Sequence, residues 1–301
     1  MESLEHLHRQ LDSLDELRTI VKTMKALSAA SIRQYEQAVI ALRGYSQTVE
    51  RGLYVVVKDM QSPPAPVPPS RHSPQPPPRQ AAIVFGSDHG LCGRFNEEIT
   101  QHALAHLDAS APAPDQRLIL AVGARVAASL EQAGQAIEED FMVPGSAERI
   151  TATVQQILLK VDEWREQAGV HYVYLFYNRH TSSRAYQPTT LELLPLNLQR
   201  FQQLNSGPWP SRSLPTFSMD RERLLSHLLR QYLFVTLFRA CAESQASEHA
   251  SRLAAMQAAQ RNLDERLDEV TMTFRRARQS VITSELLDVV SGFEAITTKT
   301  T

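Results

Sequence analysis

The 301-residue chain lacks proline over two long stretches, one at each end. No proline occurs in residues 1–62 or in residues 216–301. Because proline interrupts helices, its absence permits a long continuous helix at each end. Nine of the 17 prolines fall instead between Pro63 and Pro78. That segment predicts an extended linker without a core of its own.

Cysteines, metal-binding motifs, excess charge and long apolar runs are scarce or missing, and each of these disfavours a class of protein. The only cysteines, Cys92 and Cys241, lie far apart and fit free thiols in a reducing compartment. The histidines include no H-E-x-x-H motif, so no metal centre is predicted. A net charge of −2 does not favour a nucleic-acid partner. The sequence contains no run of 18 apolar residues, so no membrane span is predicted.

The first segment carries an apolar stripe typical of a coiled coil. Its first four members follow a strict 3-4-3 spacing: Leu4, Leu7, Leu11 and Leu14. The stripe continues after an extra three-residue step at Leu17, Val21, Met24 and Leu27. Such a step is expected to overwind the supercoil locally.

The last segment changes character along its length. Its first part has a wide apolar face suited to packing on a domain, from Leu224 to Phe238. A narrow heptad follows at Leu253, Met256, Gln260, Leu263, Leu267, Val270, Phe274, Ala277 and Val281. The two helices would be about 80 Å and 115 Å long, whereas a small domain is about 30 Å across. We therefore expect them to pair with each other and to project in part.

The region between the linker and the last helix alternates strands with helices. Buried strands are predicted at 81–85, 117–122 and 170–177, with a further strand at 191–198. Helices are predicted at 95–107, 124–133 and 150–167. This order indicates an α/β fold with a mainly parallel, Rossmann-like sheet. The predicted organisation is a helix at 1–60, a linker at 61–79, a domain at 80–215 and a helix at 216–301.

One glycine-containing turn, Gly86–Gly93, follows the first predicted strand and allows three interpretations. A phosphate loop is disfavoured because no Lys-Ser/Thr pair follows the glycines. A nucleophile built from Cys92 and His89 is conceivable. A tight strand-to-helix turn accounts for the same residues without chemistry.

The arginines at 275, 276 and 278 form a short basic cluster on the last predicted helix. They follow a run of acids, which favours a solvated or protein-facing helix over nucleic-acid binding.

Motifs along nearly the whole chain resemble those of the ATP synthase γ family. Ser247–Met256 resembles its S-E-x-x-x-R-x-x-A-M pattern, and Arg278–Leu286 resembles its R-Q-x-x-I-T-x-E-[LI] signature. Val290-Ser291-Gly292 is similar to its terminal V-x-G. Ile20–Ser31 is similar to the family's N-terminal I-T-K-A-M segment, and Ser87–Gly93 to its S-D-R-G-L-C-G turn. The motifs occur in the family's order.

The resemblance implies the central rotor shaft of an F-type ATP synthase, a non-catalytic subunit without cofactor or metal. It implies an antiparallel coiled coil inside a hexamer of α and β subunits, with the α/β domain near the ε subunit and the c-subunit ring. The complex would attach to the cytoplasmic face of the bacterial inner membrane. The implied partner contacts are Lys22, Met24, Lys25, Arg278, Gln279, Thr283, Phe293 and Ile296.

Some positions depart from the family pattern. His89 replaces its arginine, Arg94 its second glycine after Cys-Gly, and Arg275 its asparagine. Together with the proline-rich linker, these departures suggest a divergent branch, such as the alternative bacterial type. Two other classes stay open at this point, a coiled-coil scaffold and an α/β enzyme that uses the Gly86–Gly93 turn.

Overall fold

A computed structural model describes residues 4–58, 79–110, 113, 117–181, 186–198, 201 and 215–297, with side chains up to Ser291. The two terminal helices predicted from the absence of proline are present. Helix α1 spans Leu4–Lys58 and helix α6 spans Arg221–Thr297. The predicted proline linker lies outside the described residues.

Between these helices the elements alternate as predicted. They are β1 (Arg79–Phe85), α2 (Phe95–Ala109), β2 (Arg117–Val122), α3 (Ala124–Gln132), β3 (Glu139–Phe141), η2 (Ala147–Arg149), α4 (Ile150–Gln167), β4 (Val170–Arg179) and β5 (Gln187–Leu194). Helix α4 has the bounds predicted from the sequence.

The chain divides into two compact units, which are described separately here. One unit comprises Met1–Leu27 with Leu253–Thr301, and the other comprises Ser28–Arg252. Each long helix therefore contributes to both units. The four-segment boundaries expected from the sequence remain a prediction.

In the Ser28–Arg252 unit the strands form one sheet in the order β3-β2-β1-β4-β5. The strands are parallel except β5, which pairs antiparallel with β4. This confirms a mainly parallel sheet. The last strand spans Gln187–Leu194 and not the expected 191–198, and it ends at Leu194 because Pro195 lacks the N–H needed to extend the ladder. The three-residue strand β3 was not predicted, since so short a segment carries no recognisable pattern.

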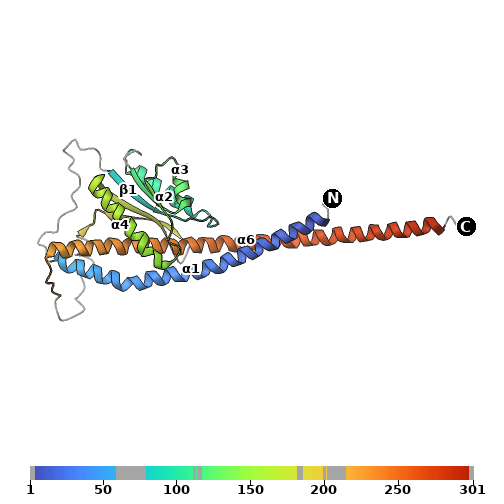
Figure 1. Cartoon of the computed structure of the whole chain (residues 1–301), viewed down its shortest axis with the longest axis horizontal. Coiled ribbons are helices and arrows are strands. Elements are labelled where there is room, and N and C mark those ends of the chain that lie inside the picture. The colour runs from blue at the N-terminus through green and yellow to red at the C-terminus, as the bar shows by residue number, and fades with distance from the viewer. Residues whose placement is uncertain are drawn as a thin grey trace. The chain divides into compact units, whose positions relative to one another are not determined.

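The core of this unit lies on both faces of the sheet. On one face, alternate residues of β1 and β2 pack against Ile99 and Ala103 of α2 and Val126 of α3. On the other face, the intervening residues pack against α4 and against α6 around Leu237 and Ala242. Helices on both faces make the sheet a buried middle layer, which explains its continuous apolar strands (Figure 1).

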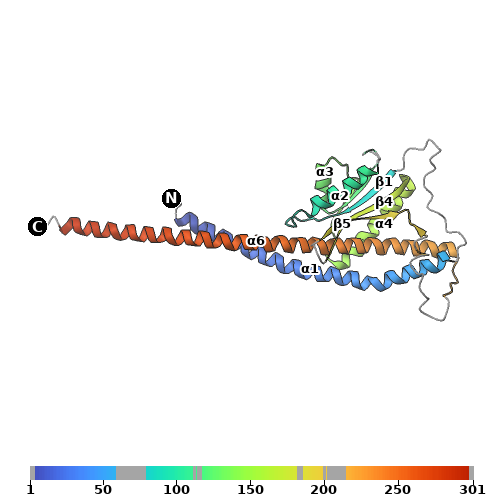
Figure 2. The same ribbon diagram turned by 180° about the vertical axis from the view of Figure 1, so that it is seen from behind.

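In the other unit, α1 and α6 pair antiparallel. Three contacts fix the direction, because residue numbers fall on α1 as they rise on α6. Lys25 Nζ donates to Gln260 Oε1 at 2.6 Å, Arg18 Nε lies 2.9 Å from Asp264 Oδ1, and His8 stacks on Phe274. The two helices run side by side in both views (Figures 1 and 2). The expected coiled coil of the termini is thus present.

The predicted extra three-residue step in α1 is wrong. Leu17 and Leu27, which define that step, are 48% and 63% exposed. The strict heptad instead continues from Leu14 to Val21 and Lys25, while Arg18, whose side chain is 49% exposed, borders the seam. The seam keeps its register because the two basic residues find polar partners on α6, and polar seam residues are a recognised way of specifying register.

Gly86 is required by the close approach of α3 to the end of β1. A Cβ built at Gly86 would lie 2.3 Å from Val126 Cβ. We expect Gly86→Ala to lower the free energy of unfolding by about 2 kcal/mol or more through overpacking, measured by denaturant titration of the purified chain. Gly145→Ala, where nothing lies within 4 Å, is the matched control and should be nearly neutral. Equal stability of the two variants would contradict the packing shown.

Candidate functional site

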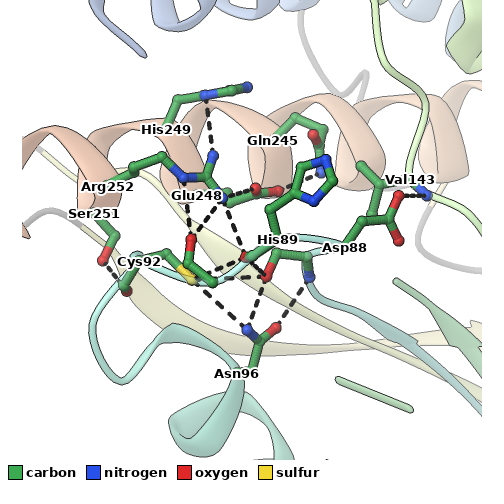
Figure 3. A network of polar contacts seen from close by, with 12 residues as sticks. Asp88, His89, Cys92, Asn96, Val143, Gln245, Glu248, His249, Ser251 and Arg252 are labelled. Atoms are coloured by element: carbon green, nitrogen blue, oxygen red, sulfur yellow. Dashed lines mark hydrogen bonds and ion pairs between the residues drawn. The ribbon is translucent and has the colours of Figure 1, made fainter. Parts of the chain in front are cut away.

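The turn after β1 is built by hydrogen bonds at the carboxyl ends of the strands (Figure 3). Gly86 N donates to Val122 O at 2.9 Å, which continues the sheet into the turn. Asn96 then closes the turn from α2. Its Oδ1 accepts from Ser87 N at 3.0 Å, and its Nδ2 donates to Ser87 Oγ at 2.8 Å. The turn is therefore rigid and internally satisfied.

Asp88 links the turn to two further elements by hydrogen bonds. Its Oδ1 accepts from Ala124 N at the start of α3, and its Oδ2 accepts from Val143 N just after β3, each at 2.9 Å. A carboxylate at a helix start satisfies an orphan backbone donor and is favoured by the helix dipole. Asp88 thus ties the turn to α3 and to the edge of the sheet.

Helix α6 supplies the remaining partners. Arg252 Nη2 donates to His89 O at 3.2 Å, Arg252 Nε donates to Gly90 O at 3.3 Å, and Ser251 Oγ donates to Cys92 O at 2.7 Å. Arg252 Nη2 also lies 2.6 Å from Glu248 Oε1, in an ion pair whose side chains are only 7% and 5% exposed. Two motifs that are 159 residues apart in sequence therefore meet in one buried network.

The residue that follows these anchored carbonyls has an unusual backbone. Leu91 has a φ of +63°, in the left-handed region that leucine seldom adopts, and its side chain is 58% exposed. Such strain persists only where the surroundings over-determine the backbone. The bonds from Arg252 and Ser251 on either side of Leu91 provide that constraint.

The network does not create an activated nucleophile. Cys92 is 2% exposed, and burial raises the pKa of its thiol above the ordinary value. The reactive form of cysteine is the thiolate, which a raised pKa disfavours. Burial also raises the pKa of the Glu248 carboxyl, with Arg252 opposing that shift. The arrangement is that of a structural cysteine beside a buried ion pair.

The turn is equally unsuited to holding a phosphate. In open parallel sheets ligands bind where the strand order reverses, here between β1 and β4. A phosphate would need free backbone N–H groups, yet Ser87 N is bonded to Asn96 and Phe95 N to Cys92 O. Ser251 and Arg252 of α6 lie against the same turn. This turn therefore presents its backbone to the protein itself.

The predicted contacts on α6 are exposed in this chain. Arg278, Gln279 and Thr283 are all exposed, and Thr283 Oγ1 donates to Gln279 O at 2.8 Å within the helix. His8 lies opposite Phe274, so the first residue of α1, Leu4, lies opposite about residue 278. Phe293 and Ile296 are within α6, but their side chains lie outside the described ones.

The predicted contacts on α1 are divided. Lys22 is exposed, whereas Met24 is half-buried. Lys25 is also half-buried and bonds Gln260 of α6 within the chain. No comparison tests any of these contacts, which remain predictions.

A band of exposed apolar side chains on α6 was not recognised from the sequence. It comprises Val281, Ile282, Leu286, Leu287, Val289 and Val290, between 42% and 70% exposed. Contiguous exposed apolar surface is typical of an interaction site. The heptad predicted a seam only as far as Val281. The start of α1 leaves this later stretch without a partner in the described part of the chain.

A histidine pair on α2 was also missed, although its spacing was readable. His102 and His106 lie one turn apart; His102 Nε2 lies 2.8 Å from Thr190 Oγ1, and the His106 ring packs against Tyr174. Within the described ranges no group of three or more His, Cys, Asp or Glu side chains could hold a metal ion. None of the described helices has the length and apolarity needed to cross a membrane.

A pair of long terminal helices and a Rossmann-like sheet tied to the second of them define a stalk-type fold. Solved structures of other proteins share this fold, and two of them are described here. One is from Euglena gracilis mitochondrial ATP synthase (OSCP/F1/c-ring), with a TM-score of 0.64, 15% identity and coverage of 97% of this chain and 94% of the other. Another is from the Tetrahymena thermophila mitochondrial ATP synthase central stalk/c-ring, with a TM-score of 0.55, 21% identity and coverage of 80% and 99%.

Sequence comparison places the chain more narrowly. The ATP synthase family model matches residues 3–296. The ATP synthase gamma chain of Heliobacterium modesticaldum is 30% identical, with 98% of this chain and 100% of the relative covered. That of Anaeromyxobacter sp. is 28% identical over the same shares. The chain belongs to the ATP synthase gamma chain family.

His249 makes this region sensitive to acid. Its ring stacks on Tyr35 with centroids 5.7 Å apart, and Arg252 Nη1 lies 3.5 Å from its Nδ1. Burial, and then the charge of Arg252, lowers the pKa of His249 to about 4. Because the unfolded chain binds this proton more readily, His249 makes stability fall as the pH drops from about 6.5 towards 4.

We expect His249→Phe, which keeps a ring against Tyr35, to flatten that decline by about 2 kcal/mol. The measurement is the free energy of unfolding of the purified full chain at a series of pH values between 4 and 7. Glu248, whose pKa is raised, contributes the opposite slope in both proteins, so the difference between them reports His249. Parallel curves would contradict this assignment.

Proposed function

We propose that this chain is the central rotor shaft of an F-type ATP synthase, which couples ion flow through the membrane sector to ATP synthesis or hydrolysis at the β subunits. The observation that carries the proposal is family membership over nearly the whole length, with 98% of this chain matched. The similar structures come from a central stalk with a c-ring and from an F1 assembly with a c-ring. Neither a scaffold nor a turn-based enzyme accounts for a match of that extent.

The partners follow from this role. The helix pair of α1 and α6 would face the α and β subunits of the catalytic hexamer. The α/β domain would face the ε subunit and the c-subunit ring. Attachment to the cytoplasmic face of the bacterial inner membrane would come through the complex. The chain itself would be non-catalytic and would bind no nucleic acid.

The exposed part of α6 supports a contact with the hexamer. Arg278 and Gln279 are exposed at the end of the stretch of α6 that faces α1, next to the exposed apolar band. An arginine guanidinium can donate two parallel hydrogen bonds to a carboxylate, which gives strength and orientation together. We propose that these two side chains make a contact with β that depends on the conformation of β. We also propose that Thr283 and the residues beyond it rotate within an apolar collar.

Replacing both residues tests this contact. In the assembled complex, Arg278→Ala with Gln279→Ala should leave assembly largely intact but lower ATP turnover or its coupling to ion transport. A fully desolvated arginine contributes about 2–5 kcal/mol on truncation, and an exposed one far less. Arg276→Ala on the same exposed stretch is the control and should change little. Unchanged turnover and ion pumping in the double variant would reduce the pair to surface residues.

The non-catalytic role is tested on the chain alone. The purified chain should hydrolyse no ATP and should show no heat of nucleotide binding by calorimetry, because the Gly86–Gly93 turn offers no lysine and its Gly86 and Ser87 N–H groups are bonded within the protein. Added α and β subunits should then yield ATPase activity. Tight nucleotide binding by the isolated chain would contradict the proposal.

A further inference from the structure

Helix α6 meets the sheet in the Ser28–Arg252 unit mainly through apolar packing. Leu237, Ala242 and Ala246 of α6 belong to the same core cluster as β1, β4 and α4. Apolar burial opposes separation of two surfaces, but it is not directional. Apolar packing therefore fixes the position of a helix along and around its axis less sharply than oriented polar contacts do.

The buried polar network at the β1–α2 turn is directional. Arg252 donates to two consecutive backbone carbonyls, His89 O and Gly90 O, and Ser251 donates to the carbonyl of Cys92. Hydrogen bonds weaken steeply when their angle or length changes. Any displacement of α6 along the turn must therefore break several of them at once.

Glu248 makes this arrangement possible. It neutralises Arg252 inside the protein, and its second oxygen accepts from Gln245 Nε2 at 3.1 Å. Among the ion pairs of the described residues, this is the one in which both side chains are less than 10% exposed. A second ion pair between α6 and the sheet joins Arg179 to Glu243. It is more exposed to solvent, because the Arg179 side chain is 45% exposed.

The turn that Arg252 grips is itself anchored in the domain. Asp88 holds the start of α3 and the end of β3, and Asn96 holds Ser87 from α2. A force on α6 would therefore pass through Arg252 into three elements of the domain rather than into one loop (Figure 3).

We infer that Glu248 and Arg252 form a latch that positions α6 on the α/β domain and prevents it from slipping under torque. Arg252 acts through the turn and touches no substrate, so it is a positioning residue. This inference rests on the proposed function, because a latch of this kind matters only where the helix and the domain transmit force to each other.

The test uses the whole complex reconstituted in lipid vesicles and driven by ATP. The readout is the membrane potential generated per ATP hydrolysed, followed with a potential-sensitive dye, so the transported ion need not be known. Arg252→Met removes the latch and should lower this ratio. Arg252→Lys keeps the charge but cannot fork to both carbonyls, and should give an intermediate ratio.

Two controls separate a latch from general stability. Arg179→Met removes the exposed tie at the same interface and should keep the wild-type ratio. Val154→Ala destabilises the fully buried core of α4 without touching the network, and should also keep the ratio even where its melting temperature falls as far as that of Arg252→Met.

The outcomes are distinguishable. A wild-type complex that generates no potential would refute the proposed function. An active wild type, with Arg252→Met assembled at an unchanged ratio, would overturn the latch alone. An equal loss in Arg252→Met and Val154→Ala would also overturn it, because stability would then explain both. If Arg252→Met does not assemble, Arg252→Lys decides: a reduced ratio supports the latch, and a wild-type ratio or failed assembly overturns it.

Discussion

The pairing of the two long terminal helices is the constraint on which the rest of this structure depends. A helix with an apolar stripe on one side is marginally stable alone and gains most of its stability from packing. Here each helix is the other's partner in both units. In the Ser28–Arg252 unit, Tyr45 donates to Gln231 and Gly52 lies against Leu228; in the other unit, Arg18 pairs with Asp264. All three pairs fit the same antiparallel alignment.

The antiparallel alignment also assigns different tasks to successive stretches of α6. The stretch up to Arg252 packs on the sheet, and the stretch from Leu253 to about residue 278 forms a seam with α1. Beyond that point α1 has ended and apolar side chains face outward. One helix thus carries a domain contact, an intrachain seam and a surface for partners in sequence, as the proposed shaft requires.

The carboxyl edge of the sheet, where sheets of this topology usually bind ligands, contacts a helix of the same chain instead. The edge at which such sheets bind ligands, beside the switch between β1 and β4, is occupied by the turn and by α6. Glycine at position 86 and the left-handed backbone at Leu91 allow the turn to approach its neighbours closely. A site that could have evolved for chemistry instead fixes a helix to a domain, which agrees with a subunit that transmits force.

The sequence by itself determined the family and the types of the long helices and main strands, though not the short strand β3. Long proline-free stretches, apolar strands and ordered motifs were sufficient, because helix continuity and side-chain periodicity are local properties. Only the tertiary structure decided which polar residues pair. It paired Arg18 and Lys25 with polar residues of α6, where leucines at 17 and 27 were expected to form the seam, and it brought Arg252 to His89 and Gly90. A charged side chain can be accommodated either in water or against a buried polar partner. Its position therefore depends on which groups the folded chain brings beside it.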